Sequence, residues 1–261
     1  MTDPRVVVRT VTGADADRAL DLAQAVWGTR PIDGHLLRAL ELAGSYVSVA
    51  EEDGDLVGMC LGIVGVQGRH VHLHSHLAAV VPDRRRAGIG RALKRHQREW
   101  CLERDIPTVS WTFDPLLHRN ARFNLTHLGA RVTAYLPELY GPMEDDLNRG
   151  DESDRLLVTW DLRSPSAVRA LDGALPLPPL DDAEVALADA GGRPEPRPNR
   201  AAVRLVAVPD DALALRRDDP DLALAWRHAV RDALRAGFAD GLAPVGVTDD
   251  RCYVLAAQEL P

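Results

Sequence analysis

Apolar and polar positions in the first 162 residues switch between the two-residue period of strands and the longer period of amphipathic helices. The pattern predicts strands at residues 5–10, 46–51, 56–66, 70–81, 107–112, 131–140 and 156–162. It predicts helices from a cap at Thr12 or Asp15 to Trp27, and at residues 32–43, 89–104 and 114–128. The order β-α-α-β-β-β-α-β-α-β-β indicates an α/β (α+β) fold, in which a mixed sheet carries helices on its faces.

Residues 164–200 interrupt this rhythm with seven prolines and little periodicity, which predicts a linker or an extended strap. Within it, residues 184–190 (EVALADA) fit either a short strand or a helical turn. A second, smaller pattern follows, with strands at 203–208, 245–248 and 252–257 and a helix at 222–238. We therefore expect a catalytic domain over 1–163, a linker over 164–200 and a small C-terminal α/β extension over 201–261.

Composition narrows the functional classes. Of the 261 residues, 46% are hydrophobic, and the net charge of −8 argues against nucleic acids and anionic membranes as partners. The first residues resemble no signal peptide, and no apolar stretch approaches membrane-spanning length. Cys60, Cys101 and Cys252 lie far apart in no metal-ligand spacing, so we expect reduced thiols, no metal and a cytoplasmic protein.

The most distinctive stretch is RRRAGIGRAL at residues 84–93, between a predicted strand and a predicted helix. Unpaired amides at a helix start, together with the helix dipole, favour an anion. Gly88 and Gly90 let the backbone approach that anion without an intervening Cβ. Seven basic residues cluster here, at 84, 85, 86, 91, 94, 95 and 98, which favours a ligand with several phosphates over a solvated helix face.

The residues from Arg85 to Gly90 (RRAGIG) are similar to the R/Q-x-x-G-x-G/A signature of the GNAT superfamily of acyl-CoA-dependent N-acyltransferases. The predicted order of elements is also the GNAT order, and the resemblance covers about residues 6–162. Three segments, HLHSHLAAV, WTFDPLLHRNARFNLTHLGA and WRHAVRDAL, resemble a GNAT branch with its own C-terminal extension. That branch, as the resemblance implies, includes enzymes that acylate the amino group of amino acids, some with succinyl-CoA.

The resemblance implies a CoA site of defined residues. Backbone amides from Arg86 to Arg91 would hold the pyrophosphate, and the strand before them would pair with the pantetheine arm. The residues so assigned are Leu77, Ala79, Val80, Val81, Arg85, Arg86, Ala87, Gly88, Ile89, Gly90, Arg91 and Asn120. The thioester of acetyl-CoA or another acyl-CoA would lie where the strands at 70–81 and 107–112 splay apart, open to attack by a neutral amine.

Four histidines, His70, His72, His74 and His76, alternate along one predicted strand and are expected on one face. A zinc site and a merely polar strand face are the alternatives to a catalytic role. As the resemblance implies, His74 stands where histone-type relatives carry a glutamate base, and His76 is the substitute. An imidazole suits that role near neutral pH.

The chain also departs from the family. Leu125 stands where relatives often have a tyrosine that protonates the thiolate, and Tyr135 or Tyr140 could serve instead. Trp111 and Phe113 share a strand face and are assigned either to the acceptor pocket or to the core. Asp114 is expected to cap a helix rather than act as an acid.

The tail offers Arg227, Arg231 and Arg235 at every fourth position, the pattern of a solvated helix edge. The alternative is that Arg227 or Arg231 clamps the carboxylate of an amino-acid acceptor. We therefore predict an N-acyltransferase that acts on a small-molecule amine, and a homodimer stays open. A CoA-binding sensor without catalysis and a protein-modifying acetyltransferase are the alternatives.

Overall fold

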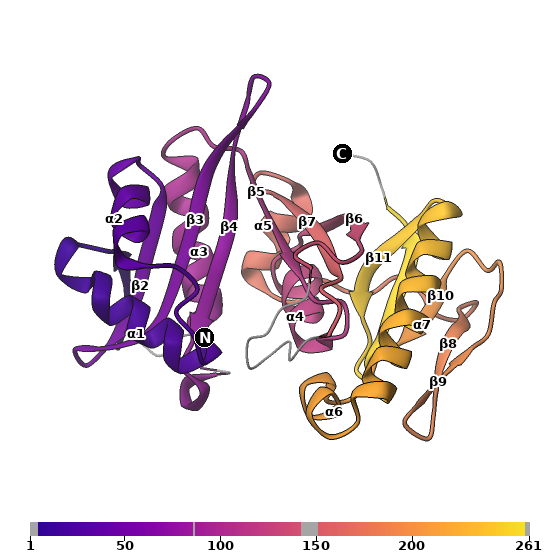
Figure 1. Ribbon diagram of the computed structural model, residues 1–261. Helices are drawn as coiled ribbons and strands as arrows, with labels where there is room; N and C mark the ends of the chain where they lie inside the picture. Colours follow the sequence, from indigo (N-terminus) through magenta and orange to yellow (C-terminus); the bar gives the residue numbers. More distant parts are fainter. Residues whose placement is uncertain (1–4, 86, 142–150, 259–261) are drawn as a thin grey trace. The chain divides into compact units, whose positions relative to one another are not determined.

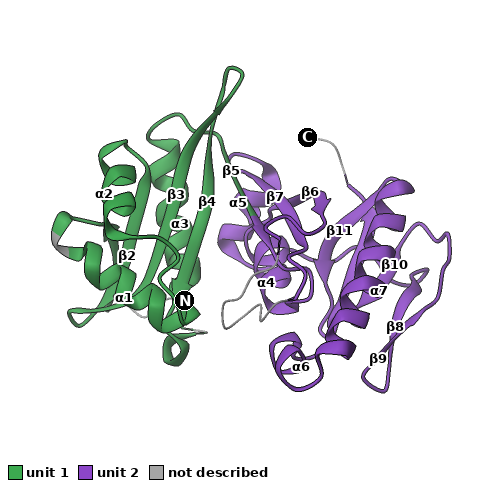
Figure 2. Cartoon of the chain, viewed as in Figure 1, with its two compact units in different colours: residues 1–111 green, residues 112–261 purple. Residues whose placement is uncertain are grey.

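The computed structural model describes residues 5–85, 87–141 and 151–258. The chain divides into two compact units, Met1–Trp111 and Thr112–Pro261, which Figure 2 colours separately. No helix among the described residues has the length and apolarity that a bilayer crossing needs. Each unit is described by itself.

Four antiparallel strands and one parallel strand form the sheet of the first unit (Figure 1). In spatial order they are β1 (Val6–Thr10), β2 (Tyr46–Glu52), β3 (Asp55–Gln67), β4 (His70–Val80) and β5 (Thr108–Phe113). The turn between β2 and β3 is tight, with Asp53 and Gly54 both at positive φ. The strands predicted from the two-residue pattern are confirmed here.

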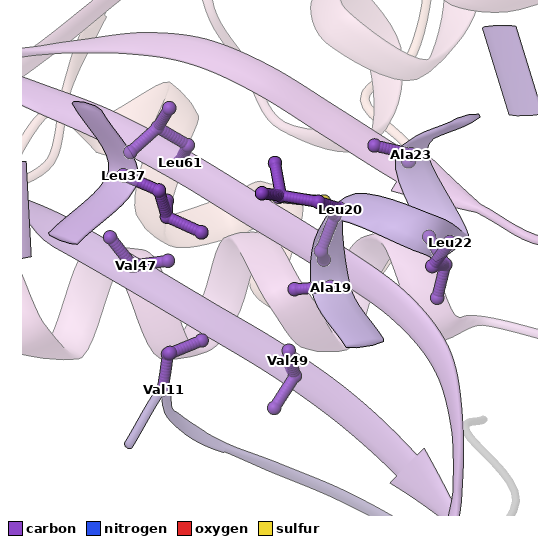
Figure 3. Packing of buried hydrophobic residues seen from close by; sticks show 11 residues of the cluster. Val11, Ala19, Leu20, Leu22, Ala23, Leu37, Val47, Val49 and Leu61 are labelled. Atoms are coloured by element: carbon purple, nitrogen blue, oxygen red, sulfur yellow. The ribbon is translucent and has the colours of Figure 1, made fainter. Parts of the chain in front are cut away.

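Two helices, α1 (Ala16–Trp27) and α2 (Gly34–Leu42), bury their apolar stripes on one face of this sheet. Figure 3 shows Leu20 and Leu37 from these helices packed among Val47, Val49 and Leu61 of the strands. Burying a leucine fully stabilises the fold by roughly 1.5–3 kcal/mol, so this cluster holds the helices in place. The Asp33 carboxylate caps α2 by accepting from the Leu36 amide at 2.8 Å, which sets the helix start two residues after the predicted one.

The amphipathic helix α3 (Ile89–Leu102) packs against the sheet positions that α1 and α2 leave uncovered. A Cβ added to Gly58 of β3 would lie 3.0 Å from the Ile89 side chain and 3.1 Å from Leu93. Neighbouring Met59 belongs instead to the core beneath α1 and α2. Because successive strand residues point to opposite faces, α3 covers the other face of the sheet.

Among the residues that the structure describes, the second unit holds the antiparallel pair of β6 (Arg131–Leu136) and β7 (Arg155–Asp161), a five-stranded sheet and four α-helices (Figure 1). The sheet order is β11 (Leu242–Val247), β12 (Cys252–Ala257), β10 (Arg204–Ala207), β8 (Glu184–Ala190) and β9 (Arg193–Pro196). The helices are α4 (His118–Arg122), α5 (Pro165–Asp172), α6 (Ala212–Asp218) and α7 (Pro220–Ala239).

The predicted order of elements is confirmed from β1 to β7. Two further boundaries were wrong. The helix expected from Asp114 begins at His118, with a π-helical last turn at Phe123–His127, and the strand expected over 131–140 ends at Leu136. Asp114 accepts from the Leu116 amide at 2.9 Å in a turn before the helix, so it does not cap α4. The stretch expected to be a linker contains α5, β8 and β9, and the segment EVALADA is a strand.

Candidate active site

The chain leaves β4, passes through the 3-10 turn η2 (Pro82–Arg84) and enters α3 at Ile89. Gly88 has φ 80° and ψ 0°, a left-handed conformation that favours glycine. The Ala92 amide donates to the Gly88 carbonyl at 3.0 Å, so the amides of Ile89 and Gly90 precede the first intrahelical bond. These amides and the positive end of the α3 dipole form a site suited to an anion.

The arginines around this helix start differ in their surroundings. Arg84 donates from Nε to Glu52 on β2 at 2.6 Å, whereas Arg85 is exposed beside the helix start. Arg86 lies outside the described residues. Lys94, counted with the basic cluster in the sequence, is buried against the sheet and does not face a phosphate.

Strands β4 and β5 part directly after a short stretch of pairing. Within the described residues of the first unit, they pair at Leu73–Val109 and His74–Ser110. Beyond His74, the strand β4 continues to Val80 and pairs with β3 along one edge only. We call this region, from Ser75 and Trp111 onward, the β4–β5 opening. The β4 edge there, which includes Leu77, Ala79 and Val80, offers backbone groups to an extended ligand.

A β-bulge at His76 interrupts the predicted alternation of histidines. Ser75 pairs with Gly62 and Leu77 pairs with Leu61, so His76 has no partner on β3. Ser75 contacts α3, whereas Leu77 packs against the core beneath α1 and α2. The expectation that all four histidines follow one regular alternation is therefore wrong, since the strand changes face at His76.

His74 is half-buried, and its Nδ1 shares a hydrogen bond of 3.4 Å with Ser110 Oγ on β5. Its ring centroid lies 6.2 Å from that of His76. Burial, with smaller contributions from His76, His72 and Lys94, lowers the pKa of His74, and burial also lowers the pKa of His76. Both imidazoles are therefore neutral near pH 7, the state in which a ring nitrogen can accept a proton.

The described residues contain no group of three or more His, Cys, Asp or Glu side chains that could hold a metal ion. The zinc alternative for the histidine strand therefore gains no support from its geometry.

Lys94, which the sequence placed in the basic cluster, has a different position in this region. Its Nζ donates to Ser75 Oγ at 2.8 Å and to Gln97 Oε1 at 2.9 Å, and it lies 4.0 Å from the centre of the Trp111 ring. Burial lowers the pKa of Lys94 to about 8, which the nearby Cys60 and Cys101 thiols oppose. A signal was present, because Lys94 shares the buried stripe of Gln97 and Cys101 at positions i, i+3 and i+7.

The other residues that the sequence singled out are buried, exposed or hydrogen-bonded to groups of the protein. Trp111 and Phe113 are both buried, as core residues would be. Asn120 is exposed on α4, and Leu125 is buried. Tyr135 donates its hydroxyl to the Asp154 carboxylate, and the Tyr140 hydroxyl lies 3.0 Å from Thr112 Oγ1. None of these contacts by itself assigns a role in catalysis.

The tail arginines were expected at a solvated edge or around an acceptor carboxylate, and two of them bind carboxylates of the protein. The Arg227 side chain is fully buried and donates to Asp114 and Asp151, at 3.1 and 2.6 Å from Nη2. Arg231 donates to Asp154 at 2.7 Å and to Glu152. The solvated-edge prediction is wrong for Arg227, and the carboxylate-clamp role gains no support for either residue. Only Arg235 is exposed as that prediction required.

Burial alone would raise the pKa of Asp114, but Arg227 and Arg216 hold it below its ordinary value. The Asp114 carboxyl therefore stays ionised near neutral pH. It is a member of an ion network and does not supply a proton.

Residues 17–129 match the model of the acetyltransferase (GNAT) family. No curated protein matches the chain significantly. Among solved structures, yncA of Salmonella typhimurium with its cofactor acetyl-CoA is 19% identical, with a TM-score of 0.51 over 62% of this chain and 98% of its own.

The ribosomal-protein-S18-alanine N-acetyltransferase of Escherichia coli is 16% identical, with a TM-score of 0.50 over 59% of this chain and 92% of its own. Naa50 of Arabidopsis thaliana, solved with a bisubstrate analogue, is also 16% identical at a TM-score of 0.50, over 59% of this chain and 97% of its own. These likenesses agree with the family match in their fold. Residues 17–129 of this chain thus match the GNAT acetyltransferase family model, and the fold is that of the solved GNAT structures.

Proposed function

We propose that the protein transfers an acetyl or other short acyl group, succinyl included, from CoA to a primary amine of a small molecule, in particular an amino acid. The observation that carries this proposal is the left-handed Gly88 at the start of α3, in the connection that follows a strand with an open edge. A phosphate-binding helix start and an unpaired strand edge beside it suit a ligand that is anionic at one end and amide-bearing along its arm.

The residues present fit CoA. The Ile89 and Gly90 amides would hold the pyrophosphate, and a Cβ at position 88 would enter that space. Arg85 is exposed at the same helix start and would add positive charge. The open edge of β4 would pair with the amides of the pantetheine arm. When bound, an acyl-CoA supplies the thioester carbonyl that the amine attacks.

His74 is the general base in this proposal. For Nε2 to accept a proton, the neutral ring must carry its own proton on Nδ1, which then donates to Ser110 Oγ. Ser110 thereby fixes the tautomer and turns Nε2 toward the acceptor. His76, at the bulge, is the alternative base.

Support for an amino-acid acceptor comes from the similarity of the C-terminal extension to the GNAT branch named above. Arg227 and Arg231 add nothing to it, because they bind carboxylates of the protein itself. Thiol release with a range of amines therefore decides the acceptor.

The CoA site is tested with two glycines that share the same positive φ. Gly88 and Gly44 both have φ 80°, and a Cβ at Gly44 would meet no atom within 4 Å. Alanine at either position should destabilise the fold by about 1–2 kcal/mol through left-handed strain. Calorimetric titration with CoA should show at least a tenfold loss of affinity in Gly88→Ala and unchanged affinity in Gly44→Ala. Equal affinities in the two variants would place CoA elsewhere.

A further inference from the structure

Lys94 places an ammonium group at the point where β4 and β5 separate. Ser75, which accepts from it, is the first residue of β4 after the last pair with β5. Trp111, whose ring it covers, follows Ser110 directly on β5. The side chain therefore bridges the two strands at the start of the β4–β5 opening.

This ammonium is buried without a countercharge. Its contacts are Ser75, Gln97 and the Trp111 ring, and no carboxylate among the described residues of the first unit forms an ion pair with it. The ionisable groups around it are Cys60 of β3, Cys101 of α3 and His74 of β4. Removing a charge from water costs several kcal/mol, so a fold has no structural reason to keep one here.

We propose that the ammonium of Lys94 stabilises the thiolate that leaves during acyl transfer and gives it a proton. This inference rests on the proposed function, which places the thioester at the β4–β5 opening. A fixed positive charge in a site of low dielectric acts strongly on negative charge that develops nearby.

Acyl transfer forms one bond and breaks another at the carbonyl carbon. A C–N bond forms between the acceptor nitrogen and the carbonyl carbon, and the C–S bond breaks with its electron pair on sulfur. Lys94 Nζ gives sulfur a proton and becomes a neutral amine. The acceptor ammonium loses two protons in all, of which His74 passes one to solvent and the other restores Lys94. With burial lowering the pKa of Lys94 to about 8, its acidity matches that of a thiol, whose pKa is about 8.5.

The test titrates the thiol of CoA bound to the protein, using the ultraviolet absorbance of the thiolate. Wild type, Lys94→Met and Lys94→Arg are compared, with CoA affinity from calorimetry and the melting temperature as controls for folding. In the wild type, the pKa of the bound thiol should lie about one unit or more below that of free CoA. Lys94→Met should bring it to the free value or above, whereas Lys94→Arg should keep it low.

Activity supplies a second readout that separates charge from proton donation. Methionine removes both, whereas arginine keeps the charge but holds its proton too tightly to give it up. Both variants should therefore lose kcat for acyl-CoA, by tenfold or more, at unchanged CoA affinity.

A bound-thiol pKa that is the same in wild type and Lys94→Met would overturn the stabilising role. Full kcat in Lys94→Arg would overturn the proton-donor role. Neither result would touch the proposed function, which fails instead if the wild type does not bind CoA or release it from acyl-CoA.

Discussion

His74 combines a half-buried ring, one bonded nitrogen and a neutral state, which are the requirements for a general base at neutral pH. Its Nε2 has no hydrogen-bond partner among the described residues of the chain. The lowered pKa of the ring widens the pH range over which it can accept a proton. The acid limb of kcat should accordingly lie below the ordinary histidine pKa of about 6.5.

Replacing His74 with glutamine should lower kcat at pH 7 by roughly ten- to a thousandfold, because glutamine keeps the size and polarity but cannot take a proton. CoA affinity should stay the same, since the amides at the start of α3 are untouched. The pH profile of kcat, measured at saturating substrates, should also lose its histidine limb and follow the amine instead. A full rate in His74→Gln, with loss of rate in His76→Gln, would move the base to the bulge.

At the scale of elements, α7 is fixed by charge as well as by apolar packing. The fully buried Arg227 side chain pairs with Asp114 and Asp151, and Arg216 pairs with the same two carboxylates. The 20-residue helix α7 therefore depends on an ion network in which each partner would be costly alone.

Arg227→Met should destabilise the second unit by about 3–5 kcal/mol, because the buried Asp114 and Asp151 carboxylates then lose one of the two arginines that pair with both of them and keep Arg216. Arg235→Met on the same helix removes an exposed charge and should change stability by less than about 0.5 kcal/mol. Urea unfolding at pH 7 measures both. Equal, small effects would show that water reaches the network.

The pH dependence of the stability of the second unit follows from the contact between Asp114 and Arg227. Asp114, with its pKa held low by Arg216 and Arg227 despite burial, contributes stability above the ordinary Asp pKa of about 3.9. That stability is lost as pH falls through the depressed native pKa. In Arg227→Met the native pKa of Asp114 rises, so acid unfolding of the second unit should begin at a higher pH.

Sequence periodicity predicted the elements well where one face of an element is buried and the other is not. The helix α3 and the strand β5 show this pattern clearly. It could not predict the bulge at His76, because the segment HVHLHSHL alternates without a break and only the pairing with Leu61 and Gly62 shows the shift. Lys94 was hidden for a related reason, since a lysine on a helix is ordinarily assigned to solvent.

The surroundings of the arginines in the tail could not be predicted, because they depend on ion pairs with residues far away in the sequence. A row of arginines at every fourth position looks the same whether it faces water or carboxylates. Asp114 and Asp151 lie 113 and 76 positions from Arg227 in the chain. No local pattern connects residues so far apart.

At the scale of the molecule, the boundary between units lies at residues 111 and 112, far from the expected boundary at 163 and 164. The antiparallel pair of β6 and β7 and the tail belong to one unit, which the network of Asp114, Asp151, Arg216 and Arg227 runs through. A catalytic domain that ends before the prolines would lack these arginines.

A chain cut after Ser164 should therefore fail to form the second unit. Asp114, Asp151 and Asp154 would lose their arginine partners, and the amides of β6 and β7 should exchange with solvent without protection. Hydrogen exchange of the full chain and the fragment measures this difference. Native protection of β6 and β7 in the fragment would show that residues 112–164 fold without the tail.

The central claim, N-acyl transfer from acyl-CoA to a small amine, is tested most directly by the release of free thiol from acyl-CoA. Acetyl-, propionyl- and succinyl-CoA are each offered to the 261-residue chain with amino acids of both hands and, separately, with short peptides. Free CoA should appear in equal amount with an acylated amino acid, identified by its mass. Binding of acyl-CoA without thiol release for any amine would contradict the claim and indicate a CoA-binding sensor, and acylation of peptides alone would contradict the small-molecule acceptor.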